Sequence, residues 1–149
     1  MPLLFGQITR SGAVVDALIG VFRARGGLLS IHGFPVPSPV RFRAMIDPGA
    51  SMSGVAPDVF RQLELTPVAQ VPILTPSTTA AFPHLADEYL VSFSVLVDGT
   101  PHSFSDALPV IVADGWNEGE DANALIGRDI LERCLFSYSG PVAQFHFAF

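Results

Sequence analysis

Residues 41–54 read RFRAMIDPGASMSG, and the interpretation of the sequence depends on the role of the aspartate in the middle of this stretch. The apolar run at 44–46 predicts a buried strand that delivers Asp47 at its end. The tripeptide Asp-Pro-Gly at 47–49 favours a turn, and the small residues at 49–51 let other groups approach the backbone closely. A plain turn between two strands and a functional loop are both open at this point.

Bulk composition narrows the class of protein. The 149 residues suit one domain, at 1–149, and 49% of them are apolar, which is enough for a sizeable core. Only 15% are charged, against a typical share of about 25%, which indicates a charge-poor surface that is either small or partly covered by another subunit. The net charge is −6 and the eight cationic residues are scattered arginines, so we expect no nucleic-acid partner.

The sequence carries no signal for a membrane or for secretion. No apolar run approaches the roughly 20 residues of a membrane helix, and the N-terminus lacks the pattern of a signal peptide. A single cysteine, Cys134, excludes an internal disulfide. We therefore expect a cytoplasmic protein with no membrane partner.

Alternating apolar residues predict a mainly β domain, either a small barrel or a sandwich. Asp98-Gly99 is a strong hairpin signal, and the Gly- and Pro-rich segment 26–40 predicts a connecting loop. Segment 71–88 predicts an exposed hairpin or a mobile loop. Strands are expected within 4–9, 13–22, 41–47, 89–97, 102–112 and, as a hairpin, 135–149; helices are expected within 57–65 and, over about two turns, after Gly127.

Other candidate chemistry has little support. The four histidines share no ligand spacing, so we expect no metal site, and Cys134 is more typical of a core residue than of a nucleophile. Ser51 and Ser53 do not lie in a G-x-S-x-G elbow. The acidic loop with Glu118, Glu120 and Asp121 lacks calcium-loop spacing and predicts a solvated loop.

A second apolar run that ends in glycine before a helix, ALIGRDIL at 124–131, accompanies AMIDPGAS at 44–51. Together the two segments resemble the retropepsin-like aspartic proteases, and segment 73–91 lies where that family has its flap hairpin. The resemblance covers nearly the whole chain. It implies an all-β fold, a small closed acid-protease barrel with a short C-terminal helix.

The resemblance also implies the residues of a site. The catalytic residue would be Asp47, in an active-site loop with Pro48, Gly49, Ala50 and Ser51. The flap would lie within 75–81 and include Thr75, Pro76, Ser77, Thr78 and Thr79, although a plain surface loop is an equal interpretation of that segment. The residues that support the site would be Ile126, Gly127 and Arg128.

In this family each subunit of a homodimer supplies one aspartate, so two copies of Asp47 would meet across a two-fold axis. Their carboxylates would share one proton, activate a water and attack the carbonyl of an extended peptide. The implied partners are a peptide or protein substrate and a second copy of the chain, and no cofactor or metal is implied. The terminal strands would build the sheet between subunits.

Two departures from the family pattern bear on activity. Pro48 replaces a threonine or serine whose hydroxyl and N–H normally form hydrogen bonds across the dimer axis, and proline has neither group. Ser51 replaces an acid that pairs with an arginine at the position of Arg128, so Arg128 would use Asp129, Glu132 or another acid, or be a solvated helix-start residue. The sequence therefore supports an aspartic endopeptidase, with a weakly active or inactive peptide-binding or structural dimer as the alternative.

Overall fold

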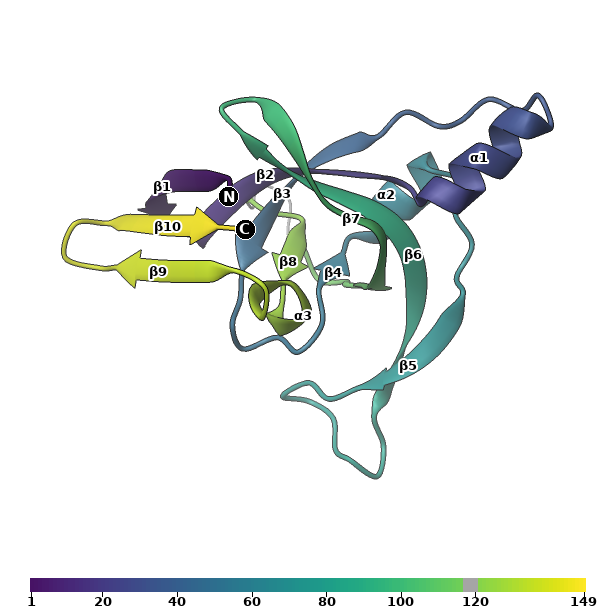
Figure 1. Cartoon of the computed structure of the whole chain (residues 1–149). Coiled ribbons are helices and arrows are strands. Elements are labelled where there is room, and N and C mark those ends of the chain that lie inside the picture. Colours follow the sequence, from purple (N-terminus) through teal and green to yellow (C-terminus); the bar gives the residue numbers. More distant parts are fainter. Residues whose placement is uncertain (117–120) are drawn as a thin grey trace.

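Strands make up about half of the computed structural model, which describes residues 1–116 and 121–149 (Figure 1). The strands and helices follow one another in an order close to the predicted one. They are β1 (Leu3–Thr9), β2 (Gly12–Val21), α1 (Arg23–Ile31), β3 (Val40–Ile46), β4 (Gly54–Val55), α2 (Pro57–Gln62), β5 (Ala69–Ile73), β6 (His84–Val97), β7 (Thr100–Val112), β8 (Ala124–Ile126), α3 (Arg128–Leu131), β9 (Leu135–Ser139) and β10 (Gln144–Ala148).

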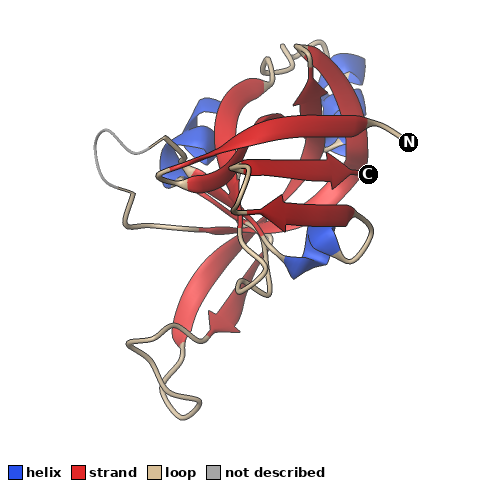
Figure 2. Ribbon diagram, turned by 90° about the vertical axis from the view of Figure 1, so that its left-hand side faces the viewer, coloured by secondary structure: helices blue, strands red, loops and turns tan. Residues whose placement is uncertain are grey.

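Six strands close into a barrel, which confirms the expected fold class. The hydrogen-bonded order β6-β7-β4-β8-β3-β2 returns to β6 through an antiparallel pairing of β2 with β6. Most neighbours are antiparallel, but β4 runs parallel to β7 and β3 runs parallel to β8, with Ala44 opposite Ala124 and Ile46 opposite Ile126. The β3–β8 pair brings the two segments that the sequence singled out to the same end of the barrel (Figure 1). Figure 2 shows that strands make up the body of the molecule and that the helices lie at its periphery.

The barrel interior is filled by the alternating apolar residues. In β2 the side chains of Ala13, Val15, Ala17 and Ile19 are buried, as the period-two pattern requires. The hairpin predicted at Asp98-Gly99 joins β6 to β7, and both residues have the positive φ that a tight primed turn needs.

Helix α2 covers one side of this core. Its residues Val59 and Phe60 are buried together with Leu63, and the Phe60 ring stacks on Tyr89 at 4.0 Å between centroids. Burial raises the pKa of the Tyr89 phenol, and the charge of Asp87 raises it further. The helix predicted within 57–65 is confirmed.

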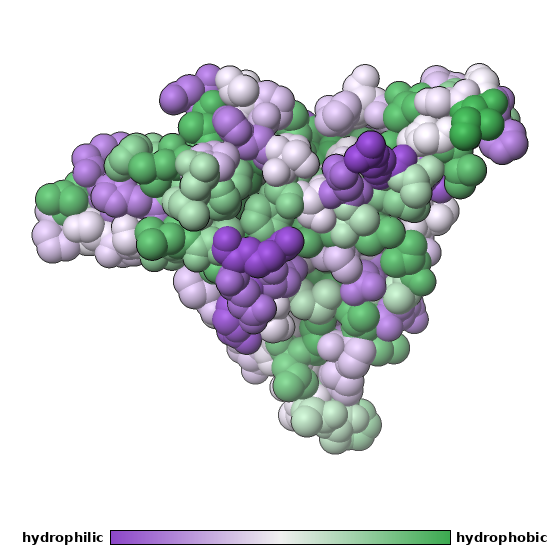
Figure 3. All heavy atoms as spheres, in the orientation of Figure 1, coloured by the Kyte–Doolittle hydropathy of each residue, from purple (hydrophilic) through white to green (hydrophobic). Residues whose placement is uncertain are grey.

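The prediction of a loop over 26–40 was wrong for its first part, because helix α1 occupies Arg23–Ile31. Gly26 and Gly27 disfavour a helix, and no residue of α1 is buried, so the sequence carried no periodic apolar face to reveal it. The helix projects from the barrel, and Leu28 and Ile31 are 59% and 79% exposed (Figures 1 and 3).

The C-terminal helix is shorter than the predicted two turns. Helix α3 ends at Leu131, and the amides of Arg133 and Cys134 then bond to carbonyls three residues back, of Ile130 and Leu131. The chain tightens here because it must turn into β9.

The terminal strands form a three-stranded layer beside the barrel, in the order β1-β10-β9. Its inner face carries buried Phe145 and Phe147. Its outer face holds no charged residue and exposes Phe5 at 68%, with His146 packed edge-on against the Phe5 ring. The residues on this face are Leu3, Phe5 and Gln7 in β1, Gln144, His146 and the buried Ala148 in β10, and Leu135, Ser137 and Ser139 in β9.

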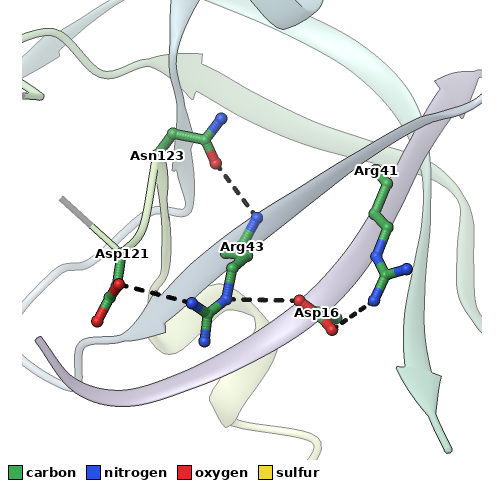
Figure 4. A network of polar contacts seen from close by, with 5 residues as sticks. All are labelled: Asp16, Arg41, Arg43, Asp121 and Asn123. Carbon is green, nitrogen blue, oxygen red and sulfur yellow. Dashed lines mark hydrogen bonds and ion pairs between the residues drawn. The ribbon is translucent and has the colours of Figure 1, made fainter. Parts of the chain in front are cut away.

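A polar network holds the segment that enters β8. Arg43 lies between Asp16 and Asp121, at 3.5 and 3.7 Å, and its backbone N–H donates to the side chain of Asn123 (Figure 4). Arg41 also pairs with Asp16, at 2.7 Å. Exposed ion pairs stabilise little individually, so the network mainly fixes where β8 begins.

None of the helices within the described residues is long and apolar enough to cross a membrane.

Candidate active site

Asp47 follows the last residue of β3 and is partly buried. Its backbone N–H donates to the carbonyl of Ile126 at 2.9 Å, which continues the parallel pairing of β3 with β8 by one more bond. The strand pair therefore fixes the backbone of Asp47 before the chain turns.

The segment after Asp47 is a turn, as its sequence predicts. The Gly49 N–H donates to Oδ1 of Asp47 at 2.9 Å, and the Ala50 N–H donates to the Asp47 carbonyl at 3.1 Å. Pro48 occupies a corner position, where its fixed φ is favourable and its missing N–H leaves nothing unpaired. The turn thus orients the Asp47 carboxylate through the backbone of its own loop.

The second segment, 126–129, crosses directly against this loop. A Cβ on Gly127 would lie 2.7 Å from the carbonyl carbon and oxygen of Met52, and 3.0 Å from the Ser53 nitrogen. Only glycine fits such a close crossing of two backbones. The Gly127 N–H donates to the Ser53 hydroxyl oxygen at 3.0 Å, so the two segments are also hydrogen-bonded where they cross.

Ser53 and Asp129 complete the crossing. Ser53 is 2% exposed and is the one buried polar side chain among the described residues. Its hydroxyl donates to Oδ1 of Asp129 at 2.8 Å, and its N–H donates to Oδ2 at 2.9 Å. The same carboxylate accepts the N–H of Ile130 at the start of α3, so one side chain ties the helix to the loop.

Of the two expectations for Arg128, an acidic partner is not found, and the residue lies exposed at the start of α3. Its guanidinium Nη1 donates to the carbonyls of Pro48 at 3.1 Å and Gly49 at 3.4 Å, and its N–H donates to the Ala50 carbonyl at 2.9 Å. No residue that the structure describes forms an ion pair with Arg128. The predicted partner Asp129 is instead occupied by Ser53.

The β5–β6 hairpin extends beside this loop, and a cavity of about 480 Å³ lies between them. Thr75 and Thr78 close the hairpin tip through N–H donation from Thr75 to the Thr78 hydroxyl at 2.7 Å. The cavity is lined mainly by Gly49, Ala50, Ser51 and Met52 from the loop, Ile73, Leu74, Thr75, Ser77 and Thr78 from the hairpin, and Ile111, Val112 and Leu125 from the barrel.

The structure therefore brings together most of the residues that the sequence singled out. Gly49, Ala50 and Ser51 share the cavity with Thr75, Ser77 and Thr78, whereas Asp47, Pro76 and Thr79 do not line it. A larger hollow of about 650 Å³, lined by residues that include Pro35, Arg41 and Glu64, contains none of the loop residues.

Sequence reasoning missed the structural roles of Ser53 and Asp129. It considered Ser53 only as a nucleophile. The available signal was a serine just before the short strand β4 and an acid in the first turn of a helix that begins directly after Gly127.

The remaining candidates lie apart from this loop. Burial raises the pKa of the Cys134 thiol to about 11, although nearby Arg133 lowers it, and the thiol donates to the Ile130 carbonyl. Within residues 1–116 and 121–149, no group of three or more His, Cys, Asp or Glu side chains could hold a metal. Glu118 and Glu120 of the acidic loop lie outside the described residues.

Two solved structures match nearly the whole chain. The retropepsin-like aspartic protease from Rickettsia conorii is 16% identical, with a TM-score of 0.57 over 99% of this chain and 91% of that one. The aspartic proteinase from Irpex lacteus is 15% identical, with a TM-score of 0.55 over 99% of this chain and 47% of that one. No family model matches the sequence, and no curated protein does.

The closed six-stranded barrel agrees with these matches. The chain has the fold of the retropepsin-like aspartic proteases.

Proposed function

We propose that residues 1–149 form a single-domain aspartic endopeptidase that cleaves extended peptides with a pair of Asp47 carboxylates from two copies of the chain. One observation carries the proposal. In an aspartic-protease fold, Asp47 stands at the end of a barrel strand, in a turn that hydrogen bonds hold against 126–129, next to a cavity beneath a hairpin.

Three observations support a homodimer. The chain supplies one such aspartate loop, and it spans only 47% of the Irpex lacteus proteinase, so two copies are needed to match that length. The outer face of the β1-β10-β9 layer is uncharged and exposes Phe5. Depletion of charge and exposure of aromatic side chains are typical of the core of a protein interface.

The chemistry follows from two carboxylates held close together. Two negative charges so close together repel each other, so the pair shares one proton. The ionised member takes a proton from a water molecule, which attacks the peptide carbonyl carbon, while the protonated member donates a hydrogen bond to the carbonyl oxygen. The attack produces a tetrahedral intermediate. Transfer of a proton from a carboxyl group to the amide nitrogen then lets this intermediate collapse, which breaks the C–N bond.

The cavity and the hairpin would seat the peptide. Residues 75–81 would act as a flap that closes over an extended substrate and pairs with its backbone, and the cavity would take a substrate side chain. The volume of about 480 Å³ lies within the usual range of ligand sites.

A second candidate function rests on Pro48. Without a hydroxyl or an N–H at this position, two chains lose the reciprocal bonds that lock the aspartate loops together in the family, each worth about 0.5–1.5 kcal/mol. A dimer with weak or no activity that binds peptides, or has a structural role, is therefore the alternative.

The test is a peptide-library digestion at mildly acidic pH with the natural chain, Asp47→Asn and Pro48→Thr. Asp58→Asn, a change of the same type at an exposed position of α2, serves as the control. We expect Asp47→Asn to abolish cleavage, Asp58→Asn to leave it unchanged, and Pro48→Thr to tighten the dimer in sedimentation. Cleavage that survives Asp47→Asn, or that comes from a monomer, refutes the peptidase; binding of peptides without cleavage supports the alternative.

A further inference from the structure

The carbonyl oxygens of residues 47–50 all have a donor within the same chain. Asp47 O accepts from the Ala50 N–H inside the turn. The next three, of Pro48, Gly49 and Ala50, all accept from Arg128, the first two from its guanidinium and the third from its backbone N–H. Arg128 is thus the main external support of the turn that carries Asp47.

The anchor of Arg128 is itself well fixed. Its backbone lies between Gly127, whose N–H donates to the Ser53 hydroxyl, and Asp129, whose carboxylate binds Ser53. A guanidinium donates charge-assisted hydrogen bonds, which are stronger than those between neutral groups. One cationic side chain therefore reaches from a rigid crossing to the exposed corner of the turn.

Among the described residues, no other group outside the turn forms a hydrogen bond with residues 48 and 49. Pro48 has no N–H and no hydroxyl, and both Pro48 and Gly49 are exposed. Without Arg128, the Pro48 and Gly49 carbonyls would bind only water, and the turn would rely on its two internal bonds to Asp47.

We propose that Arg128 is a positioning residue that sets the Asp47 turn from within its own chain. The consequence for catalysis rests on the proposed peptidase function, whereas the ordering of the turn does not. Arg128 acts on the orientation of the Asp47 carboxylate and does not touch the reacting atoms.

Amide hydrogen exchange tests the ordering. We compare the Gly49 and Ala50 amides in the natural chain, in Arg128→Gln and in Arg128→Lys, with Arg133→Gln as the control, because Arg133 follows α3 but contacts the Phe104 ring and not the loop. Exchange should be at least about five-fold faster in Arg128→Gln and unchanged in Arg133→Gln. The exchange rates in Arg128→Lys, which keeps a charged nitrogen donor, should lie between those of the natural chain and of Arg128→Gln. If Arg128→Gln fails to fold, the rates in Arg128→Lys decide whether Arg128 orders the turn.

Steady-state kinetics on a peptide that the natural chain cleaves tests the catalytic consequence. Arg128→Gln should lower kcat about ten-fold or more and change KM less than kcat, because the hairpin and barrel residues that line most of the cavity stay in place. Exchange within two-fold of the natural chain overturns the proposal, and so does faster exchange with an unchanged kcat. If the natural chain shows no cleavage that depends on Asp47, the proposed function fails, and the exchange rates alone decide the role of Arg128.

Discussion

Gly127→Ala tests whether the crossing of the two loop segments is as close as the structure shows. Gly127 has φ −91° and ψ −173°, an extended conformation that alanine adopts readily. Any cost of the substitution therefore comes from contact and not from backbone strain. The added Cβ would meet the Met52 carbonyl carbon and oxygen at 2.7 Å and the Ser53 nitrogen at 3.0 Å. These are backbone atoms, so no side-chain rotation can relieve the overlap.

The expected loss of stability has three parts. Overpacking of a close contact costs about 1–3 kcal/mol. Separation of the segments weakens the hydrogen bonds from Gly127 to Ser53 and from Arg128 to Ala50, each worth about 0.5–1.5 kcal/mol. Alanine returns about 0.4–1 kcal/mol by restricting the unfolded chain. We therefore expect a net loss of about 2–4 kcal/mol in the free energy of unfolding.

Urea denaturation followed by circular dichroism measures this loss, at one fixed protein concentration because association would shift the midpoint. The control is Gly140→Ala in the β9–β10 turn, where an added Cβ meets nothing within 4 Å. We expect the control to lie within about 0.5 kcal/mol of the natural chain. If the free energy of unfolding of Gly127→Ala is equally close to that of the natural chain, the two segments are not in contact and the described crossing is wrong.

Three further outcomes follow from the same structure. Ser53→Ala should lower the free energy of unfolding by about 1–3 kcal/mol, because it leaves the buried Gly127 N–H unpaired, whereas exposed Ser51→Ala should change it little in the same urea experiment. Cys134, with its pKa raised from 9.0 to about 11, should carry about 100-fold less thiolate at pH 8 and react correspondingly slowly with a disulfide reagent; fast reaction in the folded chain would contradict its burial. Phe5→Asp should weaken self-association in sedimentation velocity and leave the melting temperature of the monomer within a few degrees; an unchanged association constant would exclude the outer face of the terminal sheet as the dimer interface.

Much of the fold could be predicted because the barrel follows local rules. Alternation marked the strands, and Asp98-Gly99 marked a hairpin whose residues need positive φ. Helix α1 could not be found in this way, since nothing in it is buried and its two glycines oppose a helix. The sequence of α1 therefore lacks the periodic apolar residues from which a helix is predicted.

The partner of Arg128 could not be predicted for a different reason. From the sequence alone, an arginine is expected to pair with a nearby acid, here Asp129 or Glu132. In the structure the partners are backbone carbonyls, which every residue has and no sequence marks. The contact depends on the parallel pairing of β3 with β8, a long-range feature that brings residue 128 to residues 48 and 49.

This contact changes what Pro48 means for the proposed function. A proline in the loop after Asp47 first suggests a damaged site, because the family uses a hydroxyl there. Yet within one chain Pro48 lacks no bond, since its own carbonyl accepts from Arg128 and its ring suits the corner of the turn. In the proposed dimer, Pro48 would remove only a contact between chains. The cost would then fall on the affinity of that dimer and not on the geometry of each Asp47, so activity should rise steeply with protein concentration. A rate per chain that does not depend on concentration would argue against a loosely paired site.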